Sequence, residues 1–105
     1  MTASMRQQLA GLLELAGQMQ ACAVAADWDG VAVRRDTLQR QVETLFAGGV
    51  NPEETPELAE GIRRIIEMNG TVITHCRAAR DAHAAILEDV RAGRRAVSSY
   101  AANAG

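Results

Sequence analysis

His75, Cys76 and His83 form the closest group of side chains that could hold a metal ion or act as nucleophiles. Cys76 and His83 are seven residues apart, so a helix would place both on one face. Tetrahedral zinc needs four ligands, and Cys22 on another segment is the only further cysteine. We therefore expect no metal site, with His83 partly buried. Both cysteines lie on apolar helical faces, which favours buried reduced thiols over a disulfide.

The same group does not have the arrangement that nucleophilic catalysis requires. His75 and Cys76 point in different directions around a helix, and neither an orienting acid nor a glycine-rich turn accompanies them. An acidic run also occurs in the sequence, and solvated charge together with the helix dipole accounts for it without a function. The run consists of Glu53, Glu54, Glu57 and Glu60. We therefore expect no catalytic residues, no cofactor and no enzymatic activity.

The charge of the chain argues against nucleic acid as a partner. All eleven basic residues are arginine, and thirteen acidic residues bring the formal charge to -2. The densest basic cluster, Arg91, Arg94 and Arg95, is explained by a solvated helix end. The sequence also contains no apolar run long enough to span a bilayer and no pattern typical of a leader peptide. We therefore expect a cytoplasmic protein.

One apolar ladder dominates the second half of the chain. Its members alternate in steps of four and three residues, which is the spacing of a seam on one helix. At about 1.5 Å per residue, a helix from Leu58 to Tyr100 is roughly 60 Å long. The seam consists of Leu58, Ile62, Ile65, Asn69, Val72, Cys76, Ala79, His83, Ile86, Val90, Gly93, Val97 and Tyr100.

Similar spacing and end signals predict two further helices. Residues 4–26 carry an apolar stripe that includes Leu9, Leu12 and Met19. Residues 28–47 follow, with Asp27 as the expected cap and Gly48-Gly49 as the end. Thr55 and Pro56 are a typical helix start after the acidic loop Val50–Thr55, which predicts a third helix over 56–98. Residues 99–105 are expected to form a flexible tail.

These segments predict an all-α fold, an antiparallel three-helix bundle or hairpin with a long third helix, in one domain covering 1–105. Three apolar residues lie beside the seam instead of on it and need another partner: Ile66, Ile73 and Leu87. Asn69 is polar at a seam position. It either sets the register of the helices or has its amide satisfied by a nearby carbonyl.

Four sequence features taken together resemble the FliT family of flagellar export chaperones. They are the leucine-rich first helix with Met19, the Asp27-Trp28-Asp29 turn, the Ile65-Ile66-Glu67-Met68-Asn69 segment and the closing Ser98-Ser99-Tyr100. Each feature is common by itself, but their order and spacing are more specific. The resemblance covers nearly the whole chain.

The resemblance implies a cytoplasmic chaperone that binds the C-terminal helical region of the filament-cap protein, FliD, and delivers it to the type III export gate. On this hypothesis an apolar groove holds the client helix. Its expected lining is Ile66, Ile73 and Leu87, with Leu13, Leu38 and Phe46 as contributors.

In the family, a tyrosine near the end of the third helix docks the loaded chaperone to the cytosolic domain of the gate protein, FlhA. Tyr100 matches that place; the alternative is that Tyr100 closes the seam as its last core residue. Enteric members also bind the export ATPase complex and the regulator FlhDC.

Two other hypotheses assign a different function to the same apolar surfaces, and both stay open at this point. The apolar strips of a self-associating helical adaptor would bury each other in a homodimer. A regulatory anti-activator would instead use them to capture a flagellar transcription factor.

Overall fold

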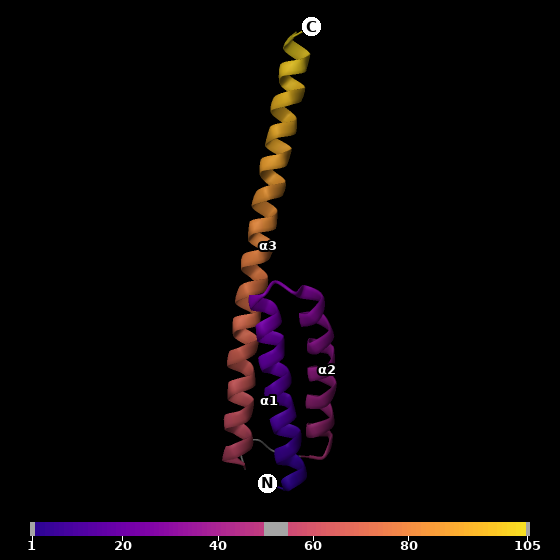
Figure 1. The fold of residues 1–105 in the computed structure, drawn as a ribbon, viewed down its shortest axis with the longest axis vertical. Helices are drawn as coiled ribbons and strands as arrows, with labels where there is room; N and C mark the ends of the chain where they lie inside the picture. The colour runs from indigo at the N-terminus through magenta and orange to yellow at the C-terminus, as the bar shows by residue number, and fades with distance from the viewer. Residues whose placement is uncertain (1, 50–54, 105) are drawn as a thin grey trace. The chain divides into compact units, whose positions relative to one another are not determined.

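The protein consists of three α-helices in a computed structural model that describes residues 2–49 and 55–104 (Figure 1). Helix α1 spans Ala3–Val24, α2 spans Trp28–Ala47 and α3 spans Pro56–Ala104. No strand occurs within those described ranges. The predicted all-α fold with a long third helix is confirmed.

Two helix ends differ from the sequence prediction. Helix α3 continues to Ala104 instead of ending at residue 98, so the expected flexible tail is helical up to that residue. Three of the five residues from Tyr100 to Ala104 are alanine, which has the highest helix propensity. Helix α1 ends at Val24, two residues before the predicted end.

The early end of α1 comes from a backbone motif around Ala26. Ala26 has φ +58°, in the left-handed region where a continuing helix is impossible. Its N–H donates to the Ala23 carbonyl at 3.1 Å, and the Asp27 N–H donates to the Cys22 carbonyl at 2.8 Å. This pair of bonds is a Schellman motif, with alanine at the position that glycine usually occupies.

Asp27 also begins the next helix. Its carboxylate accepts a hydrogen bond from the Gly30 N–H at 3.0 Å, which confirms it as the cap of α2. At the other end of α2, the N–H of Gly49, with φ +79°, donates to the Phe46 carbonyl at 3.0 Å. Pro56 is the first residue of α3, as its fixed φ favours. Residues 50–54 of the predicted acidic loop lie outside the described residues.

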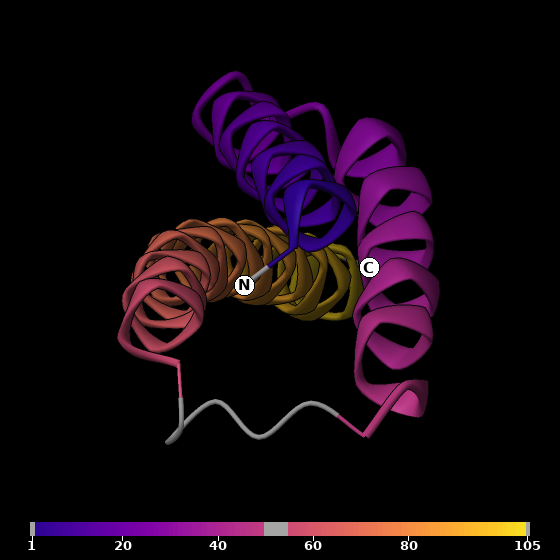
Figure 2. The same cartoon turned by 90° about the horizontal axis from the view of Figure 1, so that it is seen from below.

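The packing divides the chain into two units, one ending at His75 and the other starting at Cys76. In the first unit, α1 and the beginning of α3 run in the same direction and α2 runs opposite to both (Figure 1). The end-on view in Figure 2 shows α1 beside both of its neighbours. Near the start of both helices, Arg6 Nε donates to the Glu57 carboxylate at 3.2 Å, which agrees with the parallel direction.

The core of the first unit is built from the predicted stripes of all three helices. Buried apolar side chains recur every three to four residues on α1 and every seven on α2 and α3, so each helix presents one face. The core consists of Leu9, Leu12, Ala16, Met19, Ala23, Val31, Leu38, Leu45, Leu58, Ile65 and Val72. Cys22 is half-buried beside this core and carries a free thiol.

The second unit continues α3 without a buried core of its own. Every described side chain from Arg80 to Asn103 is exposed. His83 is therefore exposed instead of partly buried, which corrects the sequence prediction. Tyr100 is 78% exposed, so the alternative in which it closes the core is wrong for this chain. Cys76 is half-buried and its thiol is free.

Candidate functional site

An apolar groove lies between α2 and α3 within the first unit. It holds about 330 Å³. Helix α2 contributes one face at spacings of three and four residues, and α3 contributes two of its turns. The groove is lined by Arg35, Leu38, Gln39, Val42, Glu43, Ile65, Ile66 and Asn69.

The lining is apolar at the bottom and polar at the edge. Leu38 and Ile65 are core residues, so the bottom of the groove is the surface of the core itself. Ile66 stands beside it with 65% of its surface exposed. Arg35, on the α2 side, is exposed. An exposed apolar surface with polar and charged residues around it is typical of a protein-binding site.

Two adjacent isoleucines show how α3 serves the core and the groove together. Ile65 and Ile66 differ by about 100° around the helix, because 3.6 residues make one turn. Ile65 therefore points into the core at 8% exposure, while Ile66 does not. Ile73 lies seven residues after Ile66, on the same face of α3, and is also exposed. The apolar face thus continues for two turns beyond Ile66.

The groove brings together three of the residues singled out from the sequence: Leu38, Ile66 and Asn69. Ile73 extends the same face of α3. Leu13 and Phe46 are half-buried and are not part of the lining. Leu87 and Tyr100 belong to the second unit, where both are exposed.

The sequence did not predict Val42 as part of the groove, nor the charged edge formed by Arg35 and Glu43. The signal was available in the spacing, because residues 35, 38, 39, 42 and 43 follow the three- and four-residue steps of a single helix face. That face, however, contains both charged and apolar residues, so it does not stand out in the sequence as an apolar stripe.

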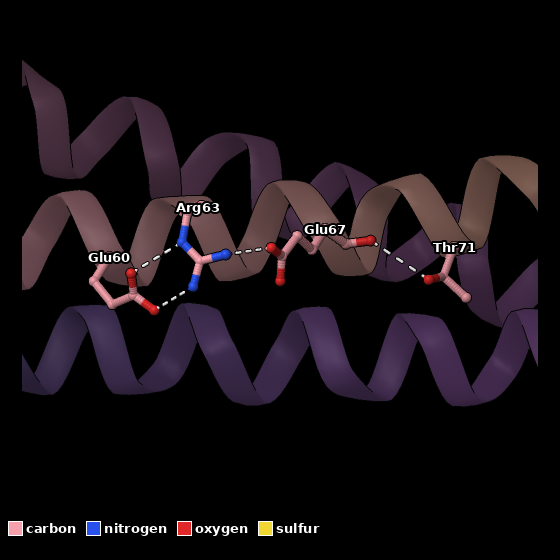
Figure 3. A network of polar contacts seen from close by, with 4 residues as sticks. All are labelled: Glu60, Arg63, Glu67 and Thr71. Carbon is pink, nitrogen blue, oxygen red and sulfur yellow. Dashed lines mark hydrogen bonds and ion pairs between the residues drawn. The ribbon is translucent and has the colours of Figure 1, made fainter.

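The acidic residues on α3 lie among arginines on an exposed face. Arg63 lies between Glu60 and Glu67 and bonds both carboxylates, and the Thr71 hydroxyl donates to the Glu67 carbonyl at 3.4 Å (Figure 3). The hydrogen bond from Arg63 lowers the pKa of Glu60 below its ordinary value of 4.5, and the Glu60 carboxylate raises the pKa of Arg63. These interactions fit the interpretation of this run as solvated charge. Glu53 and Glu54 lie outside the described residues.

Within residues 2–49 and 55–104, no three side chains of His, Cys, Asp or Glu are grouped so as to hold a metal ion. No described helix has both the length and the apolar character needed to cross a membrane.

The fold and the groove define the class of this molecule as a small all-α protein with an exposed apolar interaction surface. Its sequence matches the family model described as "Flagellar protein FliT" over residues 6–102. Because the match covers nearly the whole chain, the protein belongs to the FliT family of flagellar export chaperones, as the sequence features indicated. No curated protein and no solved structure matches the chain.

Proposed function

We propose that this protein is a cytoplasmic chaperone that binds the C-terminal helical region of the filament-cap protein FliD and delivers it to the flagellar export gate. The observation that carries the proposal is the exposed apolar groove between α2 and α3, with Ile66 at its edge. Membership of the FliT family supplies the biological setting.

An amphipathic client helix fits the chemistry of this groove. The apolar face of the client helix would pack against Ile66 and Leu38 in the groove, and its polar face would stay in water. Arg35 and Glu43 are eight residues apart on α2, or roughly 12 Å at the rise of an α-helix. Their opposite charges would favour one direction of the client helix over the other. Binding in the groove would thereby cover the apolar face of the client, through which client molecules would otherwise associate with one another.

Asn69 has a positioning role in this proposal. It is half-buried at a seam position and lines the groove. A polar side chain at such a position favours the one helix register in which its amide keeps a partner. Asn69 would thus hold α3 in the register that presents Ile66 and Ile73 to the client.

Tyr100 would dock the loaded chaperone to the cytosolic domain of FlhA. Its high exposure on the second unit leaves both the ring and the hydroxyl available to a partner. Tyrosine offers a large apolar area at a small entropy cost, which makes it a frequent anchor of protein interfaces. The client and the gate would therefore contact different units of the chain.

Calorimetric titration with the C-terminal segment of FliD from the same organism tests the proposal. We expect a saturable complex of one client per chain with a negative heat-capacity change. Ile66→Asp and Ile73→Asp should each weaken binding at least about tenfold, because a carboxylate would be desolvated in the groove. Unchanged affinity in both variants would remove the groove from the proposal.

Val33→Asp is the matched control for these variants. Val33 lies on α2 with the same 65% exposure as Ile66, but it is not part of the groove lining. It should leave client binding unchanged. Tyr100→Ala should also leave client binding unchanged while weakening a pull-down with the FlhA cytosolic domain. Equal losses in Val33→Asp and Ile66→Asp would point to non-specific adhesion instead of a groove.

A further inference from the structure

The groove between α2 and α3 has opposite charges at its two ends. Arg35 and Glu43 both belong to its α2 side, and the apolar side chains of Leu38 and Val42 lie between them along the helix. Gln39 donates a hydrogen bond to the Glu43 carboxylate at 3.4 Å, which steadies that carboxylate at the edge of the groove. Within residues 2–49 and 55–104, neither Arg35 nor Glu43 takes part in an ion pair. Both charges are therefore available to a bound helix.

A second hydrogen-bond donor accompanies Arg35 at the positively charged end. Helices α2 and α3 run in opposite directions, so residues that precede Leu38 on α2 lie at the same end as residues that follow Ile65 on α3 (Figure 1). Arg35 and Asn69 therefore share one end of the groove. A guanidinium group holds several N–H donors in one plane, and the amide of asparagine adds its own N–H donors. Together the two side chains are suited to bind a carboxylate.

Helix α3 adds no charge to the described lining of the groove. The residues that it contributes are uncharged and consist of Ile65, Ile66 and Asn69. Arg63, on the same stretch of α3, already bonds the carboxylates of Glu60 and Glu67. The charge pattern that a client meets is therefore set by α2, with a mainly apolar wall opposite.

We propose that the client of this groove is an amphipathic helix in which an acidic residue comes seven positions before a basic residue, and that it binds parallel to α2. The acidic side chain would meet Arg35 and Asn69, and the basic side chain would meet Glu43. The inference rests on the proposed function and names the chemistry and the direction of its client. Residues seven apart lie on one edge of a helix and about 10.5 Å apart along it, which nearly matches the roughly 12 Å between Arg35 and Glu43 along α2.

An acidic residue before a basic one is the order that a helix itself favours. The helix dipole stabilises negative side chains near the N-terminus of a helix and positive side chains near its C-terminus. Along α2, the groove presents Arg35 first and Glu43 second. The charges of client and groove therefore match only when the client and α2 run in the same direction. A client turned the other way would bring the opposite edge of its apolar face to α2, and its two charges would lie on the α3 side of the groove.

Paramagnetic broadening in NMR spectra of the bound FliD segment tests the direction. The two free thiols of the full chain are first removed by Cys22→Ser and Cys76→Ser. A nitroxide is then attached through Ala32→Cys or Ala47→Cys, at two exposed positions roughly 22 Å apart along α2 that lie beyond either end of the lining. The label at position 32 should broaden the N-terminal half of the client helix, and the label at position 47 its C-terminal half. The reverse pattern, or equal broadening from both labels, overturns the parallel direction.

Charge reversal tests the two ion pairs. Arg35→Glu and Glu43→Arg should each raise the dissociation constant of the FliD segment about fivefold at low salt, because each replaces an attraction with a repulsion. Added salt should shrink the increase. Arg40→Glu is the matched control, since Arg40 is exposed on the same helix but outside the lining, and the net charge changes as in Arg35→Glu. It should leave the dissociation constant unchanged. An equal loss in Arg35→Glu and Arg40→Glu, or no loss in either groove variant, overturns the ion pairs.

Two synthetic helical peptides separate this inference from the identity of the client. They share one composition and one apolar face, and each carries a glutamate and a lysine seven positions apart on the edge that faces α2 in a parallel complex. Only the order of the two charges differs. The peptide with glutamate first should bind at least about fivefold more tightly, and Arg35→Glu should abolish the difference. If the FliD segment binds but the chain does not distinguish the peptides, the charge pattern is overturned and the proposed function stands. If the chain selects the glutamate-first peptide but does not bind the FliD segment, the charge pattern is supported and FliD is not the client.

Discussion

Gly61 of α3 lies directly against Leu9 of α1. A β-carbon built on Gly61 would stand 2.6 Å from Leu9 Cδ1 and 2.7 Å from its Cδ2, which is closer than real carbon atoms approach. Leu9 is itself buried, so it has little room to move aside. The absence of a side chain at Gly61 therefore sets how closely the two helices pack at the start of the bundle.

The first prediction compares Gly61 with Gly70, a second glycine of the same helix with no atom near its missing β-carbon. Gly70→Ala should stabilise the fold by about 0.5–1 kcal/mol through helix propensity. Gly61→Ala gains the same propensity but overpacks the interface, which typically costs about 1–3 kcal/mol. We expect it to destabilise the protein. Urea unfolding measures the free energy of unfolding of both variants. If both substitutions stabilised the protein equally, Leu9 would be able to move aside without cost.

The second prediction concerns the left-handed backbone of Ala26. An alanine in that region costs about 1–2 kcal/mol, and glycine removes this strain at the price of more freedom in the unfolded chain. Ala26→Gly should therefore raise the free energy of unfolding by about 0.5–1 kcal/mol. Ala25→Gly is the control, because Ala25 has φ -82° and gains nothing from glycine. A stabilising Ala25→Gly would contradict the account.

The third prediction is a dependence of stability on pH through Glu60. Because Arg63 lowers the pKa of this carboxylate in the folded state, its contribution is present above about pH 4.5 and is lost as the pH falls through the lower folded pKa. Glu60→Gln should lower the melting temperature at pH 7 but make no difference near pH 2. Both groups are solvent-exposed, so added salt should shrink the effect at pH 7. A difference that persists at the lowest pH would require another cause.

The sequence predicted which face of each helix is apolar, but not where burial stops. The seam of α3 continues unchanged from Leu58 to Tyr100, and the core ends at Val72. A periodic pattern reports that a face is suited to burial, whereas burial itself needs a neighbouring helix of matching length. Helices α1 and α2 have 22 and 20 residues, and 20 residues of α3 lie in the first unit. The predicted lengths of the first two helices therefore already indicated that they could bury only the beginning of the long third helix.

The groove was predictable in part. Ile66 and Ile73 stood out because they lie beside the seam, and both are exposed. Leu38 was expected to contribute to the groove, but only the three-dimensional arrangement shows that α3 approaches it there. The contribution of Arg35 and Glu43 was not predictable from apolar periodicity, since charged residues on a helix usually face solvent.

The fourth prediction uses the adjacent pair Ile65 and Ile66 to separate stability from binding. Ile65→Ala removes a core side chain and should cost about 2–4 kcal/mol of unfolding free energy. Ile66→Ala removes an exposed one and should stay within about 0.5 kcal/mol of the parent. Affinity for the FliD segment should show the opposite order when both are measured at a temperature where each variant is folded. The loss in Ile66→Ala should then exceed that in Ile65→Ala, because only Ile66 presents its side chain to a client. If Ile65→Ala lowered both the stability and the affinity for the FliD segment more than Ile66→Ala did, α3 would have no binding face separate from its core face.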